Sequence, residues 1–181
     1  CRLCGGRDVE LVLPLAPTPV GDAYRLAERI QGPDEMYPLE LSLCRGCGHV
    51  QLLDVVDPEV LYDHFLYETS ISLGLVEHFK GCAEDVLRRV QPQARSLVVD
   101  IGSNDGTLLG FFQARGLRAL GVDPAREIAQ KAAARGVETL ATFFTAELER
   151  RLRRERGSAM IVTANNTFAN VDDLADLTEG I

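Results

Sequence analysis

A glycine-containing turn and a later acid are the residues of this chain best suited to bind a ligand. Residues 97–109 (LVVDIGSNDGTLL) predict a buried strand, a tight turn with Gly102 and Gly106, and the start of a helix. Because glycine lacks a Cβ, such a turn can approach a ligand closely, and the N–H groups of the new helix carry a partial positive charge. Asp123 ends the next strand, 23 residues after Asp100, where a carboxylate can accept hydrogen bonds from a ribose diol. This spacing predicts a site for a nucleoside-containing cofactor.

The positions of the glycines separate this turn from the dinucleotide-binding pattern. Glycine occurs at positions 102, 106 and 110, so G-x-G-x-x-G is absent. The turn is more similar to the D-x-G-x-G-x-G turn of class I methyltransferases, with Asn104 in place of the middle glycine, and asparagine tolerates left-handed backbone angles. The alternative is an ordinary βα turn that binds nothing. The predicted cofactor-binding residues are Asp100, Gly102, Ser103, Asn104, Gly106, Asp123 and, from a later turn, Asn165.

Two cysteine pairs have the spacing of metal ligands. Cys1 and Cys4 form one C-x-x-C pair, Cys44 and Cys47 form the other, and 39 residues separate the two pairs. Each short loop can supply two thiolates, so the four suit a tetrahedral zinc ion in a closed, structural site with no position left for water. Two disulfides or two redox pairs are the alternatives. We interpret the nearby His49 as a bystander.

Two polar segments are candidates for contact with a substrate. Asn165 and Asn166 follow the predicted strand 158–163, where amide side chains can orient a substrate; the alternative is an asparagine-rich turn that caps the next helix. The other segment lies between the predicted domains, and a phenol, two hydroxyls and an imidazole there could line a cleft. Its candidate substrate-binding residues are Tyr67, Ser70, Ser72 and His78. The alternative for this segment is a helix cap with a packed tyrosine.

The hydrophobic periodicity predicts three parts: a zinc-binding domain over 1–57, a helical linker over 58–93 and a cofactor-binding domain over 94–181. In the last part we expect strands at 96–101, 117–122, 137–140 and 158–163, and helices at about 105–115, 124–135, 145–156 and 171–179. Alternating strands and helices with short links imply a parallel, doubly wound sheet. The predicted fold class is therefore α/β, a Rossmann-like parallel sheet preceded by a small zinc-ribbon-like domain.

Smaller features complete the predicted arrangement. Residues 37–43 and 49–53 are expected to pair as a hairpin that the second cysteine pair turns. A long amphipathic helix is expected at about 73–90, with Cys82 on its apolar stripe. Pro124 is expected at the first position of its helix.

Composition limits the classes of partner. The chain has 181 residues and a formal net charge of -8, from 27 acidic and 19 basic side chains, which disfavours a general nucleic-acid binder. No apolar run approaches the roughly 20 residues that span a bilayer, and no signal peptide is visible. We therefore expect a cytoplasmic protein that acts on a small molecule, with no nucleic-acid or membrane partner.

Taken together, the motifs resemble the zinc-containing sugar C-methyltransferases that modify nucleotide-linked deoxysugars in bacteria. The resemblance covers essentially the whole chain. It depends on the two cysteine pairs and on four segments in order: 44–52 (CRGCGHVQL), 67–72 (YETSIS), 100–109 (DIGSNDGTLL) and 164–174 (ANNTFANVDDL). The resemblance implies that the four cysteines hold a structural zinc ion and that the turn after Asp100, with Asp123, holds S-adenosylmethionine. It also implies that Tyr67 faces the sugar.

The resemblance further implies a reaction on a 4-keto sugar, in which loss of a proton beside the carbonyl gives an enolate that attacks the activated methyl group. Tyr67, Asn165 and Asn166 are then the catalytic candidates, and the base is expected in a histidine-containing motif beyond residue 181. Four strands of a seven-strand sheet are expected here, so we expect no turnover by residues 1–181 alone. The alternatives are a zinc-containing methyltransferase of another substrate class, RNA or another small molecule, and a non-catalytic module that binds zinc and a cofactor. The sequence does not specify the sugar or the oligomeric state.

Overall fold

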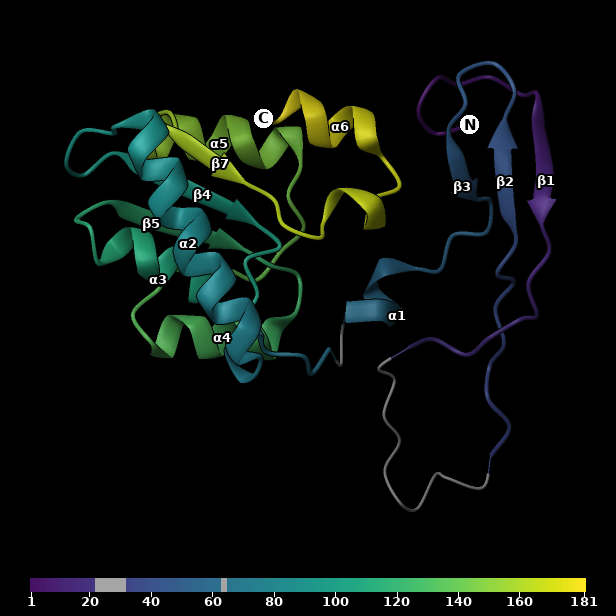
Figure 1. The fold of residues 1–181 in the computed structure, drawn as a ribbon, viewed down its shortest axis with the longest axis horizontal. Coiled ribbons are helices and arrows are strands. Elements are labelled where there is room, and N and C mark those ends of the chain that lie inside the picture. Colours follow the sequence, from purple (N-terminus) through teal and green to yellow (C-terminus); the bar gives the residue numbers. More distant parts are fainter. Residues whose placement is uncertain (22–31, 63–64) are drawn as a thin grey trace. The chain divides into compact units, whose positions relative to one another are not determined.

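A computed structural model describes residues 1–21, 32–62 and 65–181, which divide into two compact units (Figure 1). The smaller unit comprises Cys1–Phe65 with Asp172–Ala175, and the larger comprises Leu66–Val171 with Asp176–Ile181. Parts of the predicted domain 1–57 and linker 58–93, namely residues 22–31 and 63–64, lie outside the described residues. The structure places the long helix of the predicted linker in the larger unit.

The smaller unit contains a three-stranded antiparallel sheet in the order β1-β2-β3, formed by Val9–Leu13, Leu41–Cys44 and Val50–Leu52. The predicted hairpin is present as β2 and β3, with Leu41 opposite Leu52. Strand β1 was not predicted, because most of its side chains are exposed and give no clear alternation. A short helix, α1 (Pro58–Tyr62), begins after Asp57, whose Oδ1 accepts the Glu59 N–H at 2.9 Å.

Hydrophobic burial contributes little to the smaller unit. Among its described residues, the buried side chains are those of Ser42, Cys44 and Gln51. Cys44 is the only one of these three that belongs to the hydrophobic residues, and its thiol is a predicted metal ligand. A unit of this size without an apolar core needs another source of stability, and a structural metal ion is a common one.

The larger unit is built on four parallel strands in the order β6-β5-β4-β7. These are Leu97–Ile101 (β4), Arg118–Val122 (β5), Thr139–Leu140 (β6) and Ile161–Thr163 (β7). All four predicted strands are therefore present, each somewhat shorter than expected. The chain runs outward from β4 to β6 and then returns to β7 on the other side of β4. This reversal is a topological switch point, and ligands of doubly wound sheets bind at the carboxyl ends of the strands beside it.

The predicted helices are present, and α2 (Leu73–Val90) has the predicted ends. The ends are shifted in α3 (Thr107–Gln113), α4 (Arg126–Ala134), α5 (Ala146–Arg156) and α6 (Leu174–Glu179). The expectation that Pro124 opens its helix is wrong, because α4 begins two residues later, after the Asp123 carboxylate has accepted the Ala125 N–H. The helix expected from 171 begins at Leu174, after a 3-10 turn over Phe168–Asn170. None of the described helices is long and apolar enough to cross a membrane.

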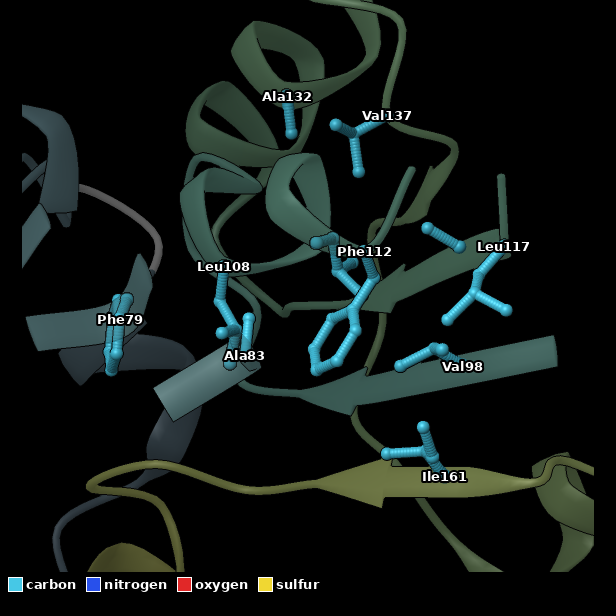
Figure 2. Close-up of a cluster of buried hydrophobic side chains, with 11 residues drawn as sticks. Phe79, Ala83, Val98, Leu108, Phe112, Leu117, Ala132, Val137 and Ile161 are labelled. Atoms are coloured by element: carbon cyan, nitrogen blue, oxygen red, sulfur yellow. The ribbon is translucent and has the colours of Figure 1, made fainter. Parts of the chain in front are cut away.

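Alternating side chains of the sheet pack against helices on its two faces. Val98, Ala119 and Ile161 belong to a cluster with residues of α2 and α3, including Phe79 and Phe112 (Figure 2). Their strand neighbours face the other way, and the second cluster includes Leu97, Val99, Leu120, Val122 and the α5 residues Leu148 and Leu152. This alternation follows from the two-residue period of a strand. The sheet is therefore the middle one of three layers, with helices packed on both of its faces.

Candidate functional site

The four cysteines of the smaller unit come together as a metal site. Their Sγ atoms all lie within 4.8 Å of one another, and Cys1–Cys47 and Cys4–Cys44 are each separated by 3.7 Å. A tetrahedron with Zn–S bonds of about 2.3 Å has edges of about 3.8 Å, so the set fits zinc closely. A disulfide needs an S–S distance of about 2.05 Å, so these separations exclude the disulfide alternative.

Each cysteine pair is held in a compact loop by its own backbone. The Gly5 N–H donates to the Cys1 carbonyl at 2.9 Å, and the Gly48 N–H donates to the Cys44 carbonyl at 2.8 Å. Both glycines have positive φ, +70° and +78°, which a residue with a Cβ adopts only with strain. The glycine directly after each C-x-x-C pair therefore lets the chain turn away from the metal site.

Backbone donors favour the thiolate form at two of the cysteines, but the net pKa shifts differ. The pKa of Cys44 is lowered, chiefly by a hydrogen bond from the Cys47 backbone and despite burial. The His49 backbone lowers the pKa of Cys47, but contacts with Cys4 and Cys44 together with burial outweigh it, so that pKa is raised. His49 is not part of the cluster found among the described residues, in agreement with its interpretation as a bystander.

In the larger unit the turn after β4 has the predicted left-handed backbone. Gly102, Asn104 and Gly106 have φ of +70°, +50° and +76°. Asn104 therefore occupies the position of a glycine, as its tolerance of this region allows.

Gly102 and Gly106 were predicted to let the turn approach a ligand closely, but the structure gives another reason for glycine at these positions. A Cβ on Gly102 would overlap Thr167 Oγ1, and a Cβ on Gly106 would lie 3.0 Å from three carbons of Val137. The space beside each glycine is thus occupied by a side chain of this protein. Close packing against Thr167 and Val137 requires glycine at both positions, independently of any ligand.

Most N–H groups of the turn are already satisfied within the protein, contrary to the expectation that they face a ligand. Gly102 and Ser103 donate to the Val122 carbonyl, Asn104 donates to Asp123, Gly106 donates to the Ser103 carbonyl, and Thr107 donates to Asp105 Oδ1. A tight turn that packs against the neighbouring strand uses its donors for that purpose. Side-chain groups of the turn are therefore the better candidates for ligand contact.

Asp100 and Asp123 are both buried at the carboxyl ends of their strands. Burial raises the pKa of Asp100 to about 7, an effect opposed by the Thr163 hydroxyl, which donates at 2.6 Å, and reinforced by the charge of Asp123. Burial also raises the pKa of Asp123, whose Oδ1 and Oδ2 accept the N–H groups of Ala125 and Asn104 at 2.9 and 2.8 Å. Each Asp123 oxygen retains a lone pair that could accept a hydroxyl.

The segment 67–70 lies directly against the glycine turn. Asn104 Nδ2 donates to the Tyr67 carbonyl at 2.9 Å, and the Ser70 N–H donates to Asp105 Oδ2 at 3.0 Å. Of the four predicted substrate-binding residues, Tyr67 therefore contacts the predicted cofactor-binding residue Asn104, and Ser70 contacts Asp105, which had not been predicted. The Tyr67 side chain is exposed, which leaves it accessible to a ligand.

The remaining predicted site residues, Ser72, His78, Asn165 and Asn166, lie near the turn or on α2. Ser72 precedes α2 without a side-chain cap, and His78 is exposed on α2 with its ring 5.8 Å from the neighbouring Phe79 ring. Asn165 and Asn166 follow β7 at the switch point, and Asn166 has a positive φ of +55°. Their backbone carbonyls accept bonds from Thr167 Oγ1 and Asn170 Nδ2, at 3.2 and 3.0 Å.

Sequence reasoning missed the residues that hold the site together. These are Thr69, Asp105, Arg135, Thr163 and Thr167. Asp105 carried a usable signal, because an acid two residues before Thr107 commonly accepts bonds from a helix start. The other four act across 30 or more residues of sequence, and no local pattern predicts such pairs.

The fold and its sites define a doubly wound α/β unit joined to a smaller unit whose four cysteines can hold a metal ion. Comparisons with known proteins agree. Residues 1–62 match the family described as "Putative zinc binding domain". The whole chain is 33% identical to the C-methyltransferase NovU of Streptomyces niveus, over all 181 residues and 43% of that protein. The predicted resemblance is thus confirmed: residues 1–62 match a zinc-binding family, and the whole chain is similar to a C-methyltransferase.

Two solved structures are similar at a lower level. A crystal structure of a "putative methyltransferase from antibiotic biosynthesis pathway" from Anabaena variabilis is 22% identical, with a TM-score of 0.32, over 37% of this chain and 27% of that one. The plantazolicin methyltransferase BpumL, in complex with SAH, is 15% identical, with a TM-score of 0.41, over 58% of this chain and 39% of that one.

Proposed function

We propose that this protein is an S-adenosylmethionine-dependent C-methyltransferase whose acceptor is a nucleotide-linked 4-keto-deoxysugar. The observation that carries the proposal is the identity of 33% to a C-methyltransferase over all 181 residues of the chain. The chain spans 43% of the length of that relative. The activity, the acceptor and the roles below are accordingly proposals.

The residues at the switch point fit the methyl donor. Ser103 Oγ is buried and has no hydrogen-bond partner among the described residues, so a ligand atom or a water must satisfy it. Asp123 retains lone pairs that could accept hydrogen bonds from a ribose diol. Asp100 lies at the end of β4, where burial disfavours its charged form, and a cation bound beside it would stabilise that form. S-adenosylmethionine, when bound, supplies an electrophilic methyl group.

The roles that we propose for the substrate side are binding and orientation. The exposed Tyr67, with Ser70, Ser72 and His78, would contact the sugar nucleotide. The amides of Asn165 and Asn166 would orient the keto group and the carbon beside it, and asparagine amides do not compete as nucleophiles for the methyl group. The zinc ion would be structural, because four thiolates leave no open coordination position for chemistry.

Isothermal titration calorimetry with S-adenosylmethionine tests the first part of this proposal. We expect saturable binding by the wild-type protein and at least about tenfold weaker binding by D123N, which corresponds to the loss of about 1.4 kcal/mol. D85N, which changes an exposed carboxylate on α2, is the matched control and should bind normally. Lack of binding by zinc-loaded wild-type protein would overturn the proposal and favour a non-catalytic module.

A methyl-transfer assay tests the acceptor. A panel of nucleotide-linked 4-keto-deoxysugars and a structured RNA should be offered in parallel with labelled donor. Binding of a keto sugar supports the proposed acceptor. Labelling at a carbon beside the keto group would support the acceptor as well, but it would overturn the expectation that residues 1–181 alone do not turn over. Salt-dependent binding and labelling of the RNA would instead support an RNA methyltransferase.

A further inference from the structure

Asn104 is the residue at which the glycine turn, Asp123 and the segment 67–70 meet. Its backbone N–H donates to Asp123 Oδ2 at 2.8 Å. Its side chain bonds to the segment 67–70. Oδ1 accepts the Thr69 N–H at 2.8 Å and the Thr69 hydroxyl at 3.1 Å, and Nδ2 donates to the Tyr67 carbonyl at 2.9 Å. One residue thus binds the acid of the cofactor side with its backbone and the candidate substrate side with its side chain.

The choice of asparagine at position 104 has a physical reason. A φ of +50° favours glycine, so the backbone alone does not explain an asparagine there. Each heavy polar atom of its amide has a partner in the segment 67–70, and Thr69 itself is buried. Asparagine is therefore the residue that combines a tolerated left-handed backbone with an amide able to accept and donate at once.

A second link holds the same segment. Asp105 Oδ2 accepts the Ser70 N–H at 3.0 Å and pairs with Arg135 Nη1 at 2.7 Å. Arg135 also pairs with Glu68 at 3.2 Å, and Lys131 pairs with the other oxygen of Glu68 at 2.6 Å. The segment can therefore move away from the turn only if several hydrogen bonds and ion pairs break together.

We propose that Asn104 is a positioning residue that couples occupation of the cofactor site to the placement of Tyr67. The inference rests on the proposed function, because it takes the turn as the donor site and Tyr67 as a substrate contact. A ligand that binds the ordered turn in preference to other conformations stabilises every group that the ordered turn holds. The segment 67–70 is held in this way, so binding of the donor orders the substrate side before the acceptor arrives.

The backbone amides of Thr69 and Ser70 report this coupling directly, because their acceptors are the side chains of Asn104 and Asp105. Hydrogen–deuterium exchange of the wild-type protein should slow at 67–70 and at the turn 102–106 when S-adenosylmethionine is added. N104G keeps the backbone N–H that donates to Asp123 and tolerates the positive φ, but it removes the whole amide. This variant therefore tests the link to the segment 67–70 while leaving the backbone hydrogen bond of the turn in place.

For N104G we expect exchange at 67–70 to be about tenfold faster without ligand, since about 1.4 kcal/mol of hydrogen bonding is lost. With donor at a concentration that saturates the variant, residues 102–106 should still be protected, and the Ser70 amide should keep its bond to Asp105. The Thr69 amide, whose acceptor is lost, should no longer be protected by the donor. N104D retains the oxygen that accepts from Thr69 and loses the donor to Tyr67, so it should restore part of the protection.

Q113A is the matched control, because it removes an amide-to-carbonyl hydrogen bond, Gln113 Nε2 to the Gly136 carbonyl, at the other end of α3. Its donor-dependent protection at 67–70 should equal that of the wild type. Full donor-dependent protection of 67–70 in N104G would overturn the inference while leaving the proposed function intact. Failure of the wild-type protein to bind the donor would instead overturn the proposed function.

Discussion

The side chain of Thr167 occupies the space that a side chain on residue 102 would need. Its hydroxyl donates to the Ile101 carbonyl at 3.0 Å and lies against Gly102. The turn after β4 and the loop after β7 are thus packed together at the switch point of the sheet. The loop that carries Asn165 is held by the turn that carries the predicted cofactor residues, so a change in one displaces the other.

Gly102→Ala should therefore be destabilising for two reasons. A Cβ at φ +70° costs about 1–2 kcal/mol, and the overlap with Thr167 adds to that cost. Urea denaturation should show a loss of about 2 kcal/mol or more, and G102A/T167A should recover only the part due to overlap. Gly110→Ala is the control: a Cβ there meets nothing within 4 Å, and alanine favours the helix by about 0.5–1 kcal/mol. A stable G102A protein would show that the turn has another conformation.

Removal of zinc should unfold the smaller unit and leave the larger one folded. The smaller unit has almost no buried apolar side chains among its described residues, whereas the larger has two hydrophobic clusters. Metal analysis should give one zinc ion per chain, lost in C44S and retained in C82S, which changes the thiol outside the cluster. Chelator should abolish the hydrogen-exchange protection of β2 and β3 without changing that of β4 and β5. Equal loss in both units would show that they fold as one.

The sequence predicted the fold well because its strongest signals are local. The alternation of strands and helices, the cysteine spacing and the left-handed turn each depend on neighbouring residues, and all three are present. Strand β1 was missed because its exposed residues lack the alternation that burial imposes. The start of α4 was misplaced because the Asp123 carboxylate, rather than Pro124, determines the conformation before the helix.

The sequence predicted which residues of the turn belong to the candidate site, but it did not predict the contacts that they make. Asp100, Asn104 and Asp123 were identified from the motif, but the hydrogen bonds that use them come from distant residues such as Thr163 and Thr69. The glycines were interpreted as space for a ligand, and the structure fills that space with side chains of the protein. Such contacts depend on the tertiary fold, which one sequence does not display.

The stability of the larger unit should fall as pH rises through neutrality because of Asp100. Its pKa is raised to about 7 in the folded protein, chiefly by burial, from an ordinary value near 3.8. The folded state therefore binds a proton more tightly than the unfolded state, and this contribution is complete below pH 4 and lost as pH passes 7. Between pH 6 and pH 8 the loss should be about 1.4 kcal/mol. Denaturation of D100N over the same range should lack this component; an identical pH dependence in D100N would refute the assignment.

The ion pair between Arg135 and Asp105 should contribute more to stability than a surface pair of the same length. The Asp105 side chain is fully buried, and although burial opposes ionisation, bonds from Ser70, Thr107 and Arg135 hold its pKa below the usual value. Arg135→Met leaves that carboxylate without its cation, so we expect a loss of about 1–2 kcal/mol, reduced by the partial exposure of Arg135.

A double-mutant cycle of R135M with D105N should give a coupling energy of about 1 kcal/mol. Arg156 and Glu138 form the matched pair: their atoms are 2.6 Å apart, against 2.7 Å for Arg135 and Asp105. The Glu138 carboxylate is partly exposed, at 49%, whereas that of Asp105 is fully buried. Their coupling in R156M and E138Q should be below about 0.5 kcal/mol, because water screens both charges. Equal coupling in the two cycles would mean that burial of Asp105 does not strengthen its pair. In that case the segment 67–70 would be held to the turn mainly by Asn104, and R135M would leave the exchange of the Ser70 amide unchanged.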